Sequence, residues 1–502
     1  MKKTLLICGG VFVFLHSDKA FLHSDKAFFY IMKLNKIIFF FLLFTVFISY
    51  SQSDALLFDN DLLTKEFHQG RRDALRRQME DSSVAVFFAN PVRNRANDVN
   101  YQYHQDPNFY YLTGFTESNA ILLVFKEPHE LEVGQKAEFV DEIIFVQPRN
   151  PNLESWSGRR LGTAGVKLQL GVKAAMENNQ FAEFNIDFSK YKKVYHLPLF
   201  NDVRDDENDK GDIASLIKYF NLKTNYPKQN KENYQLTQIM AGLREIKQPE
   251  EIVLIKKAIQ MTCIGHRELM KALEPNMSEY QAQAILEYYF KNGGSECTGY
   301  PSIVGGGANS CILHYTANRK ALAGKDMLVF DAGAEYHGYT ADVTRTLPAD
   351  GKFSKEEKII YNIVLEAQLA GIAACRAGNE FRAAHKAAVT VIQKRLLEYG
   401  IIKTEEEYSK YFFHGTSHYL GLDVHDAGLF GKLAPGNIIT VEPGIYIPAG
   451  ADCDLQWWNI GVRIEDDILI TEEEPEVLSG SLPKLIEELE AIMLQTSMFN
   501  KK

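Results

Sequence analysis

The sequence has little cysteine and no two cysteines in a CxxC arrangement. There are six cysteines among 502 residues. The missing CxxC spacing argues against a zinc finger and against a thioredoxin-type redox site. Cys8 falls in a segment that we expect to be absent from the mature protein, and the five that remain are an odd number. We therefore predict free thiols rather than a disulfide framework.

The chain also lacks an excess of basic charge. Lys and Arg number 55 and Asp and Glu number 65, which gives a net charge of −10. This acidic balance argues against nucleic acid and anionic membrane surfaces as main partners. Hydrophobic residues make up 46% and charged residues 24%, an ordinary globular composition. A chain of this length predicts two or three domains.

A long apolar run is missing everywhere except near the N-terminus. Ile37–Ile48 is almost wholly apolar, follows two lysines and is short for a transmembrane helix. Residues 32–52 therefore resemble a signal peptide, with the mature chain starting at Gln52 or Ser53. This predicts an exported protein, periplasmic or secreted, with no stable membrane association after cleavage. The alternative is an uncleaved anchor.

Residues 1–31 carry a direct sequence duplication. Leu15–Phe21 reads LHSDKAF, and Leu22–Phe28 repeats it letter for letter. We assign no fold to this segment and expect it to be a mis-assigned or unstructured extension. Because the better apolar core lies after Met32, we expect translation to start there.

The rest of the chain predicts two domains of the α/β (α+β) class. Residues 54–232 form a mixed α/β domain, which begins with a helix that places four arginines, among them Arg72, on its polar side. Strands are predicted at Val84–Ala89, Ala120–Phe125 and Glu142–Val146. Polar runs on either side of residue 220 place the boundary near residue 232.

Residues 233–502 form the second domain, in which helices alternate with short strands. Pro249 is expected to start a helix, and Gly293 and Gly294 to end another. The predicted helices lie at Glu279–Lys291, within Lys355–Ala377 and within Arg382–Tyr399. The predicted strands are Asp326–Phe330, Tyr339–Thr346, Ile438–Val441 and Val462–Ile470.

Four acidic residues of the second domain stand where strands should be driest. Asp331, Asp342, Glu442 and Glu465 each adjoin or interrupt an apolar run. A carboxylate in a buried strand must be paired, protonated or bound to metal. One such residue would suggest a salt bridge, but four in one domain favour a metal cluster.

A histidine-rich segment lies among these acids. It runs from His414 through His418 to His425 and Asp426, with small residues between them, and its spacing is not the HExxH pattern. Four carboxylates and one imidazole form an oxygen-rich ligand set, which suits manganese better than structural zinc. So much negative charge would be balanced by two divalent ions.

In these acidic residues and histidines the sequence resembles a known superfamily. The metal ligands of that superfamily are matched, in the same order along the chain, by Asp331, Asp342, His418, Glu442 and Glu465. The superfamily is that of the pita-bread metallopeptidases, and His414–Asp426 resembles the signature of its proline-specific branch, peptidase family M24B. Further resemblance lies in Ser302–Tyr315, Val441–Tyr446 and Gly461–Asp467. Asn108–Phe115 and Trp156–Gly162 resemble the N-terminal domain of aminopeptidase P.

The resemblance implies a role for each metal ligand. Asp331 and Asp342 would bind one ion, and Asp342 and Glu465 would bridge to a second, which His418 and Glu442 complete. A hydroxide bridging the ions would attack the scissile carbonyl. Glu442 would also accept the proton.

The resemblance also implies roles for four residues around the metals. His314 and His425 would lie on the substrate side and stabilise the tetrahedral intermediate. The alternative is that both are core histidines. His414 would orient the site, and Arg463, two residues before Glu465 on one strand face, would pair with a ligand carboxylate.

The implied activity is removal of the first residue from peptides with proline in second place. The alternative is prolidase, which cleaves only Xaa-Pro dipeptides; the serine before His418 favours aminopeptidase P. A metal-free binding module, or a metal-free hydrolase of creatinase type, would not need the complete ligand set. The resemblance further implies a homo-oligomer, dimer or tetramer.

Overall fold

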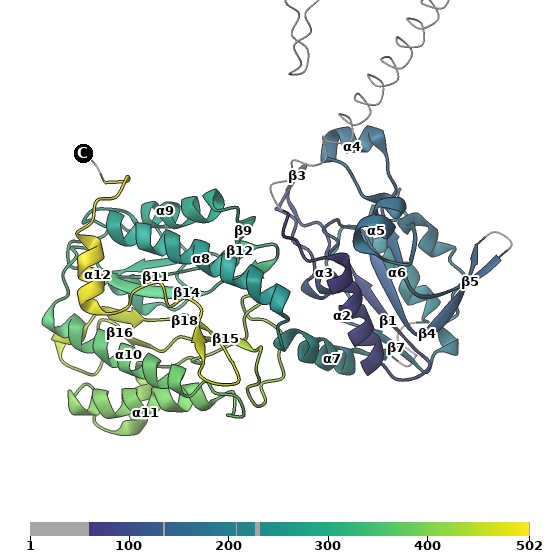
Figure 1. Ribbon diagram of the computed structural model, residues 1–502. Coiled ribbons are helices and arrows are strands. Elements are labelled where there is room, and N and C mark those ends of the chain that lie inside the picture. The colour runs from purple at the N-terminus through teal and green to yellow at the C-terminus, as the bar shows by residue number, and fades with distance from the viewer. Residues whose placement is uncertain (1–59, 134–135, 207, 226–230, 501–502) are drawn as a thin grey trace, which may run out of the picture. The chain divides into compact units, whose positions relative to one another are not determined.

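A computed structural model of the protein describes residues 60–133, 136–206, 208–225 and 231–500 (Figure 1). The predicted extension, residues 1–31, and the predicted signal peptide, residues 32–52, lie outside these ranges. Within them, none of the helices combines the length and the apolar composition needed to cross a membrane.

The N-terminal domain is built on a six-stranded mixed sheet with the strand order β6-β5-β4-β1-β7-β8. β1 pairs antiparallel with β4 and parallel with β7. All three predicted strands are confirmed. The strands are β1 (Ser83–Phe88), β4 (Ile121–Val133), β5 (Lys136–Val146), β6 (Ala174–Glu177), β7 (Lys193–His196) and β8 (Lys231–Glu232), with a small separate hairpin of β2 (Asn94–Ala96) and β3 (Val99–Asn100).

Helices and short 3-10 turns surround this sheet. They are α2 (Lys65–Gln78), α3 (Pro107–Thr113), α4 (Pro151–Ser157), α5 (Gly162–Leu170), α6 (Ile213–Lys223), η1 (Asn178–Ala182) and η2 (Phe188–Lys190). The aromatic stretch Asn108–Phe115 forms most of α3, whose Phe109 and Tyr111 are fully buried. α3 ends at Gly114 with φ +69, a left-handed conformation that favours glycine.

One expectation for α2 is wrong. Arg72 does not lie on the polar side of the helix, because its side chain is fully buried. Its guanidinium meets the Glu142 carboxylate in a two-pronged contact, with Nε–Oε2 at 2.7 Å and Nη2–Oε1 at 3.0 Å. Glu142 lies on β5, where an unpaired buried carboxylate would be costly. Arg72 is therefore buried, because it pairs with this carboxylate.

The second domain begins with two helices joined at Pro249. They are α7 (Asn233–Glu245) and α8 (Pro249–Ala272), and Pro249 is the first residue of α8, as predicted. The other helices and 3-10 turns are α9 (Glu279–Asn292), α10 (Lys355–Ala373), α11 (Ala383–Glu398), α12 (Ile486–Met493), η3 (Gly307–Cys311), η4 (Glu405–Lys410) and η5 (Leu455–Trp457).

Short antiparallel strands of this domain lie between two helix pairs. In Figure 1, α8 and α9 cover one side of the strands, and α10 and α11 cover the other. The strands are β9 (Cys297–Thr298), β10 (Ile303–Gly306), β11 (Met327–Ala332), β12 (Ala334–Tyr336), β13 (Tyr339–Thr340), β14 (Val343–Pro348), β15 (Ile438–Val441), β16 (Gly444–Ile447), β17 (Ile460–Arg463), β18 (Asp466–Leu469) and β19 (Glu476–Val477).

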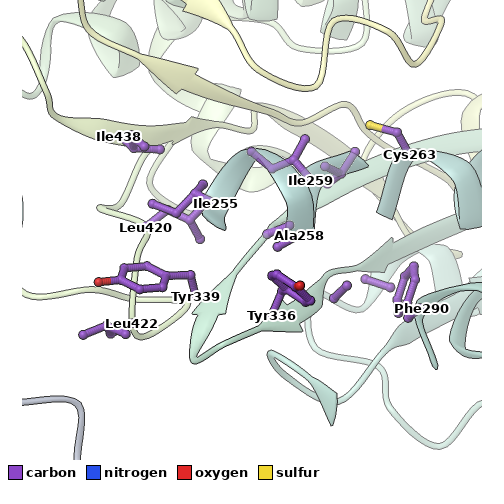
Figure 2. Close-up of a cluster of buried hydrophobic side chains, with 14 of the residues drawn as sticks. Ile255, Ala258, Ile259, Cys263, Phe290, Tyr336, Tyr339, Leu420, Leu422 and Ile438 are labelled. Atoms are coloured by element: carbon purple, nitrogen blue, oxygen red, sulfur yellow. The ribbon is translucent and has the colours of Figure 1, made fainter. Parts of the chain in front are cut away.

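The core of the second domain forms where α8 packs on the strands. Ile255 and Ile259 of α8 are buried and lie close to Tyr339, Leu420 and Ile438 (Figure 2). The apolar side chains recur along α8 at the three- and four-residue spacing of one helix face. This packing supports the strands that carry the acidic residues.

Two predicted strands are each divided into two. The predicted strand Tyr339–Thr346 is β13 followed by β14, and Val462–Ile470 is β17 followed by β18. β13 pairs with β12, whereas β14 pairs with β11. Likewise β17 pairs with β16, whereas β18 pairs with β15. The chain changes sheet at both breaks, and the breaks contain Asp342 and Glu465.

Candidate active site

Every residue singled out as a site residue lines one cavity of the second domain. The cavity has a volume of about 620 Å³. The nine residues on its wall are Asp331, Asp342, His418, Glu442, Glu465, His314, His414, His425 and Arg463. Residues more than a hundred positions apart in the sequence therefore meet at one place.

The acidic residues reach the cavity from strand ends and strand breaks. Asp331 is near the end of β11 and lies opposite Thr344 of β14 in the register. Asp342 and Glu465 occupy the two breaks, and Glu442 stands between β15 and β16. Because the regular pairing stops at three of these positions, the side chains can turn toward a common centre.

Three donors lie close enough to share one cation. Single ligand atoms of Asp342, His418 and Glu465 are all within 4.8 Å of one another. His418 Nε2 is 3.3 Å from Asp342 Oδ2 and 3.5 Å from Glu442 Oε1. Carboxylates with an imidazole form a donor set that divalent ions accept.

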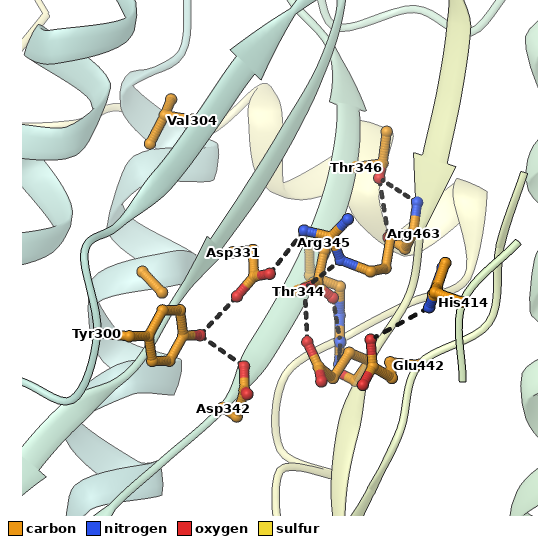
Figure 3. Close-up of polar contacts among 12 residues, drawn as sticks. Tyr300, Val304, Asp331, Asp342, Thr344, Arg345, Thr346, His414, Glu442 and Arg463 are labelled. Carbon is orange, nitrogen blue, oxygen red and sulfur yellow. Dashed lines mark hydrogen bonds and ion pairs between the residues drawn. The ribbon is translucent and has the colours of Figure 1, made fainter. Parts of the chain in front are cut away.

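Asp331 joins this group through a tyrosine hydroxyl. The Tyr300 hydroxyl lies 2.5 Å from Asp331 Oδ1 and 2.5 Å from Asp342 Oδ1. Figure 3 shows the ring pointing at both carboxylates. Tyr300 thus links Asp331 of β11 to Asp342, which directly precedes the neighbouring strand β14.

The acidic residues carry more negative charge than their surroundings stabilise. Burial, together with the nearby acids, raises the pKa of Glu442 to about 7. Burial also raises the pKa of Asp342, and it raises that of Glu465 well above its usual range, with neighbouring carboxylates adding to both. Burial alone would lower the pKa of His418, but the hydrogen bond with Asp342 and the charge of Glu442 raise it to about 9.

This electrostatic situation fits a metal centre. At neutral pH solvated carboxylates have lost their protons, whereas the metal-free cluster retains some of its own. A divalent cation supplies the missing positive charge and takes the place of those protons. The chemistry of the donor set therefore agrees with the predicted role of these residues.

Arg463 lies against the cluster on its buried side. Its Nη2 is 2.6 Å from Asp331 Oδ2, so the predicted pairing of Arg463 with an acidic residue of the site is confirmed as a contact. Its Nε donates to the Thr344 hydroxyl at 3.1 Å, and that hydroxyl donates to Glu465 Oε2 at 2.6 Å. The argument from a shared strand face does not hold, because Arg463 ends β17 and Glu465 lies in the break.

His414 is connected to Arg463 through Tyr446. Arg463 Nη1 donates to the Tyr446 hydroxyl at 3.0 Å, and that hydroxyl lies 3.0 Å from His414 Nε2. His414 Nδ1 donates to the Gly415 carbonyl at 2.7 Å, which leaves Nε2 as the acceptor. Burial and the charge of Arg463 lower the pKa of His414 to about 3, so the ring is neutral.

His314 and His425 lie on the open side of the cavity. Neither side chain is buried, so the alternative that they are core histidines is wrong. The His425 ring is 4.4 Å from the His418 ring, centre to centre. Partial shielding from solvent within the cavity and the charge of His418 lower the pKa of His425.

Two curated relatives match this chain over nearly their whole length. It is 37% identical to an Xaa-Pro aminopeptidase of Haemophilus influenzae and 35% identical to the Xaa-Pro aminopeptidase of Escherichia coli, each over 86% of this chain and 98% of the relative. Residues 253–472 match "Metallopeptidase family M24", and residues 68–195 match "Aminopeptidase P, N-terminal domain".

The chain belongs to metallopeptidase family M24.

Solved structures of family M24 share the fold. An alanine variant of Escherichia coli aminopeptidase P superposes with a TM-score of 0.77 at 32% identity, over 86% of this chain and 99% of that one. A Pseudomonas aeruginosa aminopeptidase gives a TM-score of 0.76 at 33% identity, over 86% of this chain and 98% of that one. The predicted fold, an N-terminal mixed α/β domain followed by a pita-bread catalytic domain, is thereby confirmed.

Three residues beside this M24 centre were not found from the sequence. Tyr300 contacts two acids, Thr344 contacts Glu465, and Asp467 Oδ2 accepts the backbone N–H of Asp342 at 3.2 Å. The signal for Asp467 was available, since it follows two acids and directly precedes the apolar run Ile468–Ile470. Tyr300 and Thr344 belong to residue types that are common in strands and turns, so only their position in space distinguishes them.

Proposed function

We propose that this protein is a metal-dependent aminopeptidase that hydrolyses the N-terminal Xaa-Pro bond of peptides. The observation that carries the proposal is the convergence of Asp331, Asp342, His418, Glu442 and Glu465 in one cavity of an M24 domain. The relatives from Haemophilus influenzae and Escherichia coli, which match over nearly their whole length, are Xaa-Pro aminopeptidases. A metal-free binding module would have no need of buried acids whose charges oppose one another.

Bound divalent ions would acidify a water molecule and polarise the scissile carbonyl. Around them the chain's own residues take separate tasks. Glu442, whose Oε1 lies 3.5 Å from His418 Nε2, is the carboxylate that we expect to accept the proton from that water. His314 and His425 line the open side, where a ring N–H can donate to the oxygen of a tetrahedral intermediate. Arg463 holds the Asp331 carboxylate in place through a buried ion pair.

The number and identity of the ions belong to the same proposal. Four carboxylates bring more negative charge than one divalent ion balances, so we infer two divalent ions per chain, with manganese favoured by the oxygen-rich set. A zinc-substituted form of Escherichia coli aminopeptidase P has been solved in complex with product. Elemental analysis of purified protein tests the number, and reconstitution with manganese, zinc or cobalt tests the preference.

The substrate preference follows from the chemistry of proline. Proline has no amide hydrogen and restricts the residue before it, so an ordinary aminopeptidase that binds that N–H fails on such bonds. A structure of Escherichia coli aminopeptidase P holds the inhibitor Pro-Leu. We expect Arg-Pro-Pro-type tripeptides to be cleaved in the presence of manganese, and Arg-Ala-Pro to remain largely intact. Faster turnover of Gly-Pro dipeptide than of tripeptides would identify a prolidase instead.

We further propose that the enzyme is exported and acts as a homo-oligomer, a dimer or a tetramer. Export rests on the apolar segment Ile37–Ile48 with its two preceding lysines. N-terminal sequencing of the protein from its native host tests it, because a mature chain that retains Ile37–Ile48 would contradict cleavage. Light scattering of the purified protein gives the oligomeric state.

A further inference from the structure

The segment from His418 to Asp426 carries two cavity histidines but is anchored outside the cavity. His418 and His425 line the cavity, whereas the Asp426 side chain is only 1% exposed. Arg244, in the last turn of α7, and Lys247, between α7 and α8, meet its carboxylate. Lys247 Nζ is 2.8 Å from Oδ2, and Arg244 Nη2 contacts Oδ1.

The two cations are as deeply buried as the carboxylate. The Arg244 and Lys247 side chains are 4% and 1% exposed. Asp423, from the same segment, lies 3.9 Å from Arg244 Nη2 at the exposed edge of this group. Because removal of one partner would leave a buried charge uncompensated, this group resists separation.

The ion group of Arg244, Lys247 and Asp426 packs tightly against the backbone of the His418–Asp426 segment. The Asp426 N–H donates to the Tyr419 carbonyl at 2.9 Å, which ties the end of the segment to its beginning. A Cβ added at Gly421 would lie 2.2 Å from Asp426 Oδ2 and 2.9 Å from Lys247 Cε. Little space is therefore left for the segment to shift while the ion group stays intact.

The same ion group also contacts the N-terminal domain. Arg244 Nη1 donates to Asn108 Oδ1 of α3 at 2.9 Å. Close by, the Tyr111 hydroxyl donates to the Leu243 carbonyl at 2.8 Å. The aromatic helix α3 thus holds the same arginine that holds Asp426.

We propose that Asp426, fixed by Arg244 and Lys247, is a positioning residue that sets the place of the His425 ring beside His418. The inference rests on the proposed function, in which His425 acts on the tetrahedral intermediate. Asp426 is the next residue after His425, so a shift of its backbone moves the imidazole directly. A displacement of about 1 Å at a reacting group can cost about 100-fold in rate.

The test begins with Asp426→Asn, which keeps the shape and removes the charge. We expect kcat for an Arg-Pro-Pro-type peptide to fall about 10- to 100-fold, with KM changed less than about twofold, because the group acts in the transition state. The matched control is Glu142→Gln, which breaks the equally buried pair with Arg72 in the N-terminal domain. The control should lower the unfolding temperature and leave kcat unchanged.

A double-mutant cycle separates positioning from general destabilisation. If Asp426 acts through His425, then Asp426→Asn should cost little further activity in a His425→Ala background. Arg244→Lys, which keeps the charge but cannot reach both Asn108 and Asp426, should give an intermediate loss. Independent, multiplying effects of Asp426→Asn and His425→Ala would overturn the proposal, as would a fall in unfolding temperature with kcat intact.

A crystal structure of Asp426→Asn keeps the test independent of the proposed activity. Absence of Xaa-Pro-Yaa cleavage by the wild-type protein would sink the proposed function alone. The positioning claim would then be decided by whether the His425 ring in the variant has moved relative to His418. A ring in its wild-type place would refute it.

Discussion

At the scale of single residues, the site is a set of buried acids that neighbouring groups hold in place. Asp342 faces three of these groups, His418, Tyr300 and the acid Asp331. Its backbone N–H is in turn held by Asp467. Loss of the Asp342 carboxylate therefore removes a donor that no neighbouring side chain replaces.

We expect Asp342→Ala to lose at least about 100-fold in activity and most of the bound metal, since even the loss of a group that only orients a ligand costs about 10- to 100-fold. Hydrolysis of an Xaa-Pro-Yaa peptide and elemental analysis after dialysis measure the two effects. The control is Asp350→Ala, an exposed acid eight positions along the chain. Full metal content in an inactive Asp342→Ala protein would contradict the ligand role.

Residue chemistry explains which site residues could be predicted from the sequence. Asp331 and Glu442 were found because a carboxylate directly after an apolar run has few structural explanations. Tyr300 was not found, because tyrosine before a proline and a glycine-rich loop is an ordinary sequence. Arg72 was placed wrongly, because its buried partner Glu142 lies 70 positions away and pairs with it only in the folded chain.

At the scale of elements, the breaks within predicted strands build the site. Apolar alternation predicted strands across Asp342 and Glu465, since periodicity gives no sign of a change in pairing partner. In the folded chain the strand halves belong to different sheets, and the break at Asp342 depends on Gly333. A Cβ added at Gly333, between β11 and β12, would lie 1.7 Å from the Ala341 carbonyl oxygen.

We expect Gly333→Ala to destabilise the protein by about 1–3 kcal/mol or more, because the overlap is with backbone that cannot move aside without shifting Asp342. Because Asp342 would move, we also expect Gly333→Ala to bind manganese more weakly. Gly70→Ala is the control, since nothing lies within 4 Å of the added Cβ on α2, and a gain of about 0.5–1 kcal/mol is expected. Thermal unfolding and manganese titration of both variants measure the effects. An unchanged manganese affinity in Gly333→Ala would contradict the link to Asp342.

At the scale of the whole molecule, the sequence predicted several helices and strands of both domains, such as β1 and α9, but it did not predict how the charges of the buried acids affect one another. Polar runs predict a boundary near residue 232, which stays a prediction. The pKa values of the acids depend on burial and on distances between residues such as Asp342 and Glu442, which no pattern in the sequence reports. Those values have a consequence for the stability of the entire fold.

The metal-free protein should lose stability as the pH rises. A carboxyl group whose pKa is higher in the folded protein than in the unfolded chain stabilises the fold at low pH, and this contribution disappears as the pH passes through the folded value. For Glu442 the window runs from about 4.3, the usual unfolded value, to about 7. The raised pKa of His418 acts in the same direction, and its contribution is lost as the pH rises through about 9.

We therefore expect the unfolding temperature of chelator-treated protein to fall between pH 5.5 and pH 7.5. Glu442→Gln should reduce this fall, because glutamine stays neutral across the range. Manganese should reverse the trend in the wild-type protein, since it binds deprotonated ligands and stabilises only the folded state. Differential scanning calorimetry with and without manganese, at both pH values, measures these effects. Identical pH dependence of the chelator-treated wild-type and Glu442→Gln proteins would show that the cluster does not hold its protons in the way that its burial requires.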